Sequence, residues 1–144
     1  MEKQKLMVGY DLCIDYSQIS YYNIEKDEPD SVELDGQAEI PTVLCRLFAG
    51  DEWLVGQQAV KAAQEGKGVP VRNFTTHIAD DPMVDVAGER MEKSGLISIF
   101  LTKTLKAIEN VSASAEIGFI TITMEDIDLA AADALVSGLS AGVP

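Results

Sequence analysis

The stretch "KLMVGYDLCIDYSQISYYNI", residues 5–24, holds two β-rich runs with a short polar segment between them. The run "KLMVGYDLCI", residues 5–14, is apolar along most of its length, which is typical of a largely buried strand. The run "ISYYNI", residues 19–24, is rich in β-branched and aromatic residues, which favour strands. The segment "DYSQ", residues 15–18, carries side chains that favour turns. The stretch therefore predicts a β-hairpin that opens the fold.

The rest of the chain alternates strand patterns with helix patterns. The clearest helix is "EKSGLISIFLTKTLKAIEN", residues 92–110, where apolar side chains recur at helical spacing and Lys103 and Lys106 lie outside the apolar stripe. The run "AEIGFITITM", residues 115–124, is apolar along most of its length and predicts a central strand. The apolar stripe of the helix consists of Ile97, Phe100, Leu101, Leu105 and Ile108. The other predicted elements are strands within 31–34, 38–48, 52–56, 69–74 and 83–91 and helices at 57–64 and 125–142.

This order of elements predicts an α/β fold. A three-stranded antiparallel meander comes first, and a later strand flanked by helices is expected to pair parallel with it, as in a ribonuclease-H-like unit. No linker or internal repeat divides the chain, so we expect one domain over residues 1–144. Its core is predicted at about 1–50 and 94–144, and a small α+β subdomain is inserted at about 51–93.

The composition excludes several classes of function. A formal net charge of −13 leaves no Lys/Arg stripe of the kind that nucleic acid or anionic lipid requires. Two cysteines, Cys13 and Cys45, are too few for a disulfide framework, and the single histidine, His77, excludes a histidine-rich metal site. The apolar runs are too short to cross a bilayer, and the N-terminus has no signal-peptide pattern. We therefore expect a cytoplasmic protein with no nucleic-acid and no membrane partner.

Four segments in order resemble the first half of the ATPase domain shared by actin, sugar kinases and the seventy-kilodalton heat-shock chaperones. "VGYDLCIDYSQISYYN" stands where that family has its first phosphate hairpin, and "EIPTVLCRLFAGDEWLVGQQAVKAA" is similar to its third strand, short hairpin and helix. "VDVAGERMEKSGLISIFLTKTLKAIEN" and "AEIGFITITMEDIDLAAADALVSGLSAG" resemble the long helix and the strand and helix that follow. The resemblance to the chaperone branch runs nearly end to end. It implies the N-terminal lobe of an actin-like or chaperone-like ATPase.

In this family the first hairpin and a second one hold the phosphates of ATP, and acidic residues hold magnesium through water. The resemblance places Asp11 at the first-hairpin aspartate, as the candidate magnesium-associated acid and the only catalytic candidate. It aligns Cys13, Ile14 and Asp15 with the family's small glycine and threonine residues, so the phosphate loop is degenerate in composition. Ser17 is the candidate hydroxyl of the loop, and Arg72 corresponds to the family's lysine.

The resemblance covers the first half of such a domain. The second phosphate hairpin and the adenosine-binding Gly-Gly segment have no counterpart among the 144 residues. For this chain alone we therefore expect no cofactor, whereas ATP and magnesium would belong to a longer protein. The expected partner is the missing second lobe or another protein, or a second copy of this chain, because surface covered by the second half in relatives would be exposed.

Three hypotheses of function remain. In the first, the chain is a degenerate lobe with weak or no nucleotide binding, acting as a scaffold or interaction unit. In the second, it is the lobe of a true ATPase with an atypical first hairpin. In the third, it is a ribonuclease-H-like nuclease in which Asp11 with Glu125 or Asp126 holds two metal ions. Glu125 and Asp126 are more simply explained as charge at a helix N-terminus, and Trp53 as an anchor of its own strand.

Overall fold

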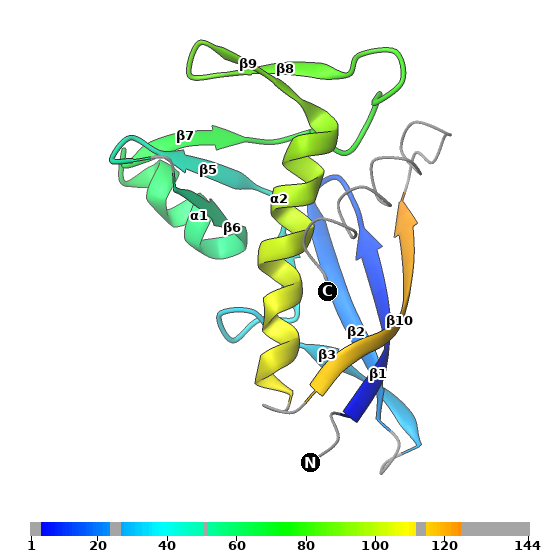
Figure 1. Cartoon of the computed structure of the whole chain (residues 1–144). Coiled ribbons are helices and arrows are strands. Elements are labelled where there is room, and N and C mark those ends of the chain that lie inside the picture. The colour runs from blue at the N-terminus through cyan, green and yellow to red at the C-terminus, as the bar shows by residue number, and fades with distance from the viewer. Residues whose placement is uncertain (1–3, 24–26, 51, 112–114, 125–144) are drawn as a thin grey trace.

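A five-stranded mixed sheet carries the fold (Figure 1). The computed structural model describes residues 4–23, 27–50, 52–111 and 115–124, and every structural statement below concerns these residues. The strand order is β10-β1-β2-β3, with β4 also paired to β2. Strand β1 pairs antiparallel with β2 and parallel with β10, so the mixed α/β character predicted from the sequence is confirmed. The five strands are β1 (Gln4–Leu12), β2 (Tyr16–Asn23), β3 (Glu28–Val32), β4 (Glu39–Pro41) and β10 (Ala115–Met124).

The side chains of strand β1 point alternately to a buried, apolar inner face of the sheet and to a solvent-exposed outer face. Its alternate residues Leu6, Val8, Tyr10 and Leu12 are all buried. The residues between them face the other way because successive side chains of a strand point to opposite sides of the sheet. Of these, Met7 is 61% exposed. The core of the protein therefore lies on one side of β1.

Helix α2 (Lys93–Leu105) and the 3₁₀ helix η1 (Lys106–Asn110) pack on the inner face of this sheet (Figure 1). Together they coincide with the helix predicted at 92–110, and the whole predicted apolar stripe is buried. Ring contact between Phe74 and Phe100, whose centroids lie 5.7 Å apart, extends this core beyond the sheet. Among the described residues no helix is both long and apolar enough to cross a membrane.

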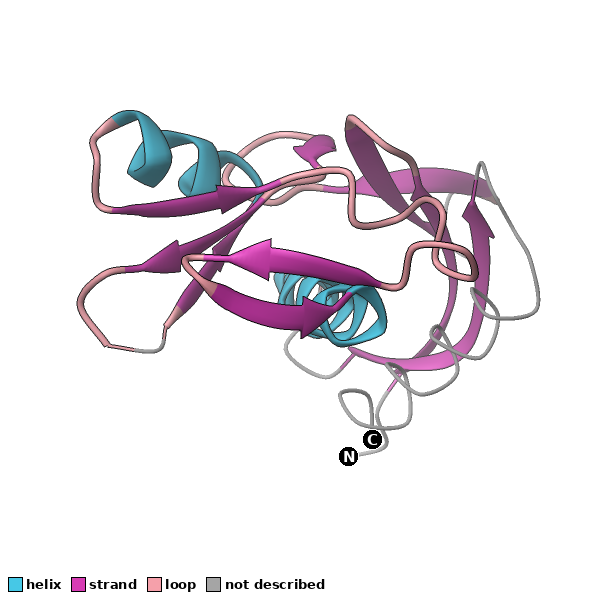
Figure 2. Cartoon of the chain, turned by 90° about the horizontal axis from the view of Figure 1, so that it is seen from above, coloured by secondary structure: helices cyan, strands magenta, loops and turns pink. Residues whose placement is uncertain are grey.

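A second, smaller layer lies on the other side of α2 from the large sheet (Figures 1 and 2). It consists of a three-stranded sheet, one helix and a two-stranded hairpin. Gly56, with φ of 65°, links the sheet to the helix, a conformation that glycine adopts without strain. The elements are β5 (Leu44–Leu47), β6 (Trp53–Val55), α1 (Gly56–Gln64), β7 (Gly68–Val71), β8 (Met83–Val86) and β9 (Glu89–Glu92).

The strand predicted over 38–48 is in fact two strands in two different sheets. Strand β4 ends at Pro41 and pairs with β2, whereas β5 begins at Leu44 and pairs with β6 and β7. The chain changes direction after Thr42, whose amide still bonds to Asp15, because the Val43 amide turns back and donates to the Pro41 carbonyl at 2.8 Å. The prediction of one continuous strand was wrong. The division into a core and an inserted subdomain stays a prediction.

Two further predictions were wrong: the residues of the hairpin turn, and the central position of the strand at 115–124 in the sheet. Strand β2 begins at Tyr16, so the turn consists of Cys13, Ile14 and Asp15 rather than residues 15–18. Strand β10 was predicted to be central, but among the described residues it pairs with β1 alone. Its side chain Phe119 is 61% exposed, so an apolar strand is no sure sign of a central position. The predicted helix at 125–142 lies outside the described residues.

Tyr10 ties the sheet to α2 through a buried hydrogen bond. The Thr104 hydroxyl donates to the Phe100 carbonyl at 2.7 Å, and the Tyr10 hydroxyl lies 2.6 Å from Thr104 Oγ1, so Tyr10 acts as the donor. Burial raises the pKa of the Tyr10 hydroxyl above its usual value of 10.0. The unfolded chain therefore releases this proton at lower pH than the folded chain, and stability falls as the pH rises above that value.

We predict that Tyr10→Phe lowers the free energy of unfolding by about 1 kcal/mol near pH 8, because one buried hydrogen bond is lost and Thr104 keeps another. Above about pH 10 the deficit of the variant should shrink, since phenylalanine has no proton to lose. Urea unfolding of both proteins at about pH 8 and about pH 11 measures both effects. A deficit that stays constant across this range would contradict the account.

Candidate functional site

The turn of the β1–β2 hairpin is the position at which the sequence predicts a phosphate loop. Its residues Cys13, Ile14 and Asp15 connect the two strands directly, and none of the three has a positive φ. Backbone amides converge on an anion when residues alternate between right-handed and left-handed conformations, a concavity called a nest. Without a left-handed residue this turn has no such nest. Within the turn, the thiol of Cys13 and the side chain of Ile14 are both half-buried.

Asp11 lies at the end of β1, opposite Gln18 on β2 and Thr123 on β10. Its carboxylate is exposed and accepts a hydrogen bond from the Thr123 hydroxyl. The parallel pairing of β1 and β10 brings these two residues together, although they are far apart in the sequence. One oxygen of Asp11 is therefore engaged by β10. Glu125 and Asp126, the predicted metal partners of Asp11, lie outside the described residues.

Ser17 faces the interior and not a ligand. It is fully buried, and its hydroxyl shares a hydrogen bond of 2.7 Å with the Thr42 hydroxyl. The Thr42 amide in turn donates to the Asp15 carbonyl at 2.9 Å. Both contacts attach the turn to the residue that follows β4. The hydroxyl predicted to serve the loop therefore holds the hairpin to its neighbouring strand.

The remaining predicted site residues lie apart from the hairpin. Arg72 follows β7 in the small sheet, is exposed, and makes no ion pair or hydrogen bond with any described residue. The imidazole of His77 is exposed and lies 3.4 Å from the Asp80 carboxylate. Within the described ranges no three His, Cys, Asp or Glu side chains gather in a way that could hold a metal ion. Trp53 is half-buried in β6, with the Arg46 guanidinium 6.0 Å from its ring, as expected for an anchor.

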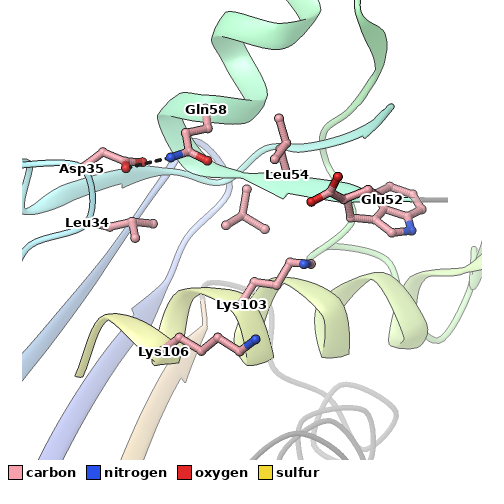
Figure 3. Close-up of a pocket in the computed structure, with 9 residues that line it drawn as sticks. Leu34, Asp35, Glu52, Leu54, Gln58, Lys103 and Lys106 are labelled. Atoms are coloured by element: carbon pink, nitrogen blue, oxygen red, sulfur yellow. Dashed lines mark hydrogen bonds between the residues drawn. The ribbon is translucent and has the colours of Figure 1, made fainter. Parts of the chain in front are cut away.

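A second feature lies between the large helix and the small sheet, and the sequence did not reveal it. We call it the α2–β6 hollow, a space of about 270 Å³ open at the surface (Figure 3). Lysine side chains from α2 and η1 form one wall, and residues of β6, α1 and the turn after β3 form the other. It is lined by Leu34, Asp35, Glu52, Trp53, Leu54, Val55, Gln58, Lys103 and Lys106.

In the sequence, the feature that indicates this hollow is the position of Lys103 and Lys106 beside the apolar stripe of the helix. Residues three apart lie on one face of a helix, so the sequence predicts that the two lysine side chains point in a similar direction. Nothing in the sequence showed that β6 would lie opposite them. That apposition is a product of the tertiary fold.

We predict that Ser17→Ala costs about 1–3 kcal/mol of stability, because it leaves the buried Thr42 hydroxyl without its partner. The matched substitution Asp11→Asn should change stability by about 0.5 kcal/mol or less, since Asp11 is exposed and asparagine still accepts a hydrogen bond from Thr123. Urea unfolding of the two variants beside the parent chain tests the assignment of roles. A larger loss for Asp11→Asn than for Ser17→Ala would show that the roles are reversed.

Three comparisons relate the chain to other proteins. No curated protein sequence matches it. Among the solved structures that it resembles is "MamK non-polymerising A278D mutant bound to AMPPNP", with a TM-score of 0.63 at 14% sequence identity. The likeness covers 98% of this chain and 39% of that one, so the chain spans well under half the length of this structural relative. At this identity the likeness shows the fold alone, which is actin-like.

The family comparison covers most of the chain, including every described element from β3 onward. The matching family model is described as "Family of unknown function (DUF5716) C-terminal" and aligns with residues 28–141. By this match, the chain belongs to the DUF5716 C-terminal family.

Proposed function

We propose that this chain is an actin-like lobe that acts as a scaffold or interaction unit, in which the first hairpin has weak or no nucleotide binding. The observation that carries the proposal is the construction of the hairpin turn. Cys13, Ile14 and Asp15 form no left-handed nest, and the nearby Ser17 hydroxyl is committed to Thr42. A turn built in this way serves packing between β2 and β4.

Electrostatics supports the same proposal. The exposed carboxylate of Asp11 lies just before the turn and that of Asp15 lies within it, and the chain carries a formal net charge of −13. Like charges a few ångströms apart repel, so a phosphate group at this turn would need a magnesium ion or a strong donor to offset them. The predicted cation, Arg72, makes no bond to the hairpin. The described residues thus offer the phosphates little attraction.

An interaction role is supported by the outer face of the sheet. Met7 on β1 and Phe119 on β10 are neighbours in the strand register, and each is 61% exposed. Adjacent exposed apolar side chains of this size are typical of surfaces that contact another protein. The partner would be a second lobe, another protein or a second copy of this chain. Light scattering tests whether the partner is a second copy of this chain, because a mass that stays monomeric at high concentration counts against self-association.

The second candidate function is the lobe of a true ATP-binding protein. It is supported by the likeness to the MamK mutant, whose solved structure is described as bound to AMPPNP, and by the place of Asp11 where β1 and β10 end together. In that case the remainder of the site would come from residues beyond this lobe. The nuclease hypothesis has no such support. It stays a prediction that incubation of the chain with nucleic acid and manganese would test.

Calorimetric titration of the chain with ATP and magnesium tests the proposal. We expect no saturable heat, because the turn lacks a phosphate-binding nest. Saturable binding that Asp11→Ala abolishes would contradict the proposal and favour the ATPase candidate. The double variant Lys103→Gln/Lys106→Gln is the control, since loss of heat there alone would place the nucleotide in the α2–β6 hollow and not at the hairpin.

A further inference from the structure

The helical wall of the α2–β6 hollow carries two positive charges. Lys103 is in the last turn of α2 and Lys106 begins η1, and both side chains lie on the side of the helix that faces β6 (Figure 3). Within the described part of the chain neither ammonium group forms an ion pair or hydrogen bond. Like charges at this spacing on a helix repel each other, and an anion between them would relieve the repulsion.

The opposite wall carries two negative charges. Glu52, just before β6, lies across the hollow from Lys103, and Asp35 lies in the turn after β3 (Figure 3). Asp35 accepts a hydrogen bond of 3.0 Å from the Gln58 side-chain amide, which fixes its position at the far end. The carboxylate of Glu52 makes no ion pair or hydrogen bond with a described residue. The hollow is therefore polarised, with cations on one wall and carboxylates on the other.

Apolar side chains line the space between these charges. Leu34 and Val55 belong to the same core cluster as the apolar face of α2 and line this space, and the single tryptophan of the chain, Trp53, also lines it. An isolated anion would be attracted by the lysines and repelled by Glu52 and Asp35. A molecule with an anionic group, a cationic group and an apolar part can place each of them against side chains of matching chemistry. The volume of about 270 Å³ limits such a molecule to a small one.

We propose that the α2–β6 hollow binds a small zwitterion, a free α-amino acid with an apolar side chain. Its carboxylate lies against Lys103 and Lys106, its ammonium group against Glu52, and its side chain against Leu34 and Val55. This site shares no residue with the hairpin turn and does not depend on the proposed scaffold role. Asp11→Ala leaves it unchanged, and the failure of either proposal leaves the other standing.

Fluorescence of Trp53 provides the test, because it is the only tryptophan and lies in the wall of the hollow. L-Leucine is the probe, with 4-methylpentanoate as the analogue that lacks the ammonium group and 3-methylbutylamine as the analogue that lacks the carboxylate. We expect a saturable change with L-leucine and binding at least about tenfold weaker for each analogue, since each loses a charge-assisted contact. An absence of saturable change with L-leucine, or equal affinity for 4-methylpentanoate, would overturn the proposal.

Two sets of variants assign the charges. Lys103→Gln/Lys106→Gln should weaken L-leucine binding by about tenfold or more, and Glu52→Gln should weaken L-leucine while leaving 4-methylpentanoate no weaker. Lys5→Gln/Lys61→Gln is the matched control, because it removes the same charge at exposed lysines that do not line the hollow. Equal binding by the first double variant and this control would also overturn the proposal. Circular dichroism confirms that each variant is folded.

Discussion

The parallel pairing of β1 with β10 is the constraint on which the rest of the structure depends. It runs from Gln4 opposite Ala115 to Leu12 opposite Met124, with one register shift between Leu6 and Met7. Parallel strands cannot be joined by a tight turn, so the chain between them must cross over through other elements. Helix α2 is the last long element of that crossover, and it packs on the inner face of β1. The buried bond from Tyr10 to Thr104 joins β1 to the last turn of α2.

This pairing also decides what the hairpin can do. Because β1 and β10 end at the same edge, Asp11 meets Thr123 there. The adjoining turn is held from the other side by the bond between Ser17 and Thr42 and by the Thr42 amide on Asp15. The Ser17 hydroxyl and one oxygen of Asp11 are thus engaged within the protein. The turn of the hairpin is thereby joined to the residue that follows β4, which is the basis of the proposal that it serves packing.

The sequence predicted the elements whose patterns are long and regular. The existence of the hairpin and the bounds of the helix at 92–110 and of the strand at 115–124 were correctly predicted from their apolar patterns, although the turn of the hairpin and the place of the last strand in the sheet were not. The split between β4 and β5 was missed, since "EIPTVLCRL" reads as one apolar run and only the two sheets reveal the change of direction after Thr42. Side-chain roles were harder to predict. Ser17 alternates with exposed neighbours in β2, and its hydrogen-bond partner Thr42 follows β4, a strand whose pairing with β2 the sequence did not show.

The sequence alone indicates only one wall of the α2–β6 hollow. Lys103 and Lys106 are recognisable as neighbours on one helix face, but Glu52, Asp35 and Gln58 come from elements that only the folded chain brings opposite them. The hairpin turn and the α2–β6 hollow therefore differ in the arrangement of their charged side chains. At the hairpin, the exposed carboxylates of Asp11 and Asp15 lie at or beside the turn. In the hollow, opposite charges face one another across an apolar floor.

The central claim is that the turn of the β1–β2 hairpin holds strands together and does not hold phosphate. A crystal structure of the chain grown with AMPPNP and magnesium measures this directly. The account predicts that the bond between Ser17 and Thr42 persists and that no phosphate lies against the amides of Cys13, Ile14 and Asp15. A phosphate bound to those amides, with magnesium beside Asp11, would contradict it.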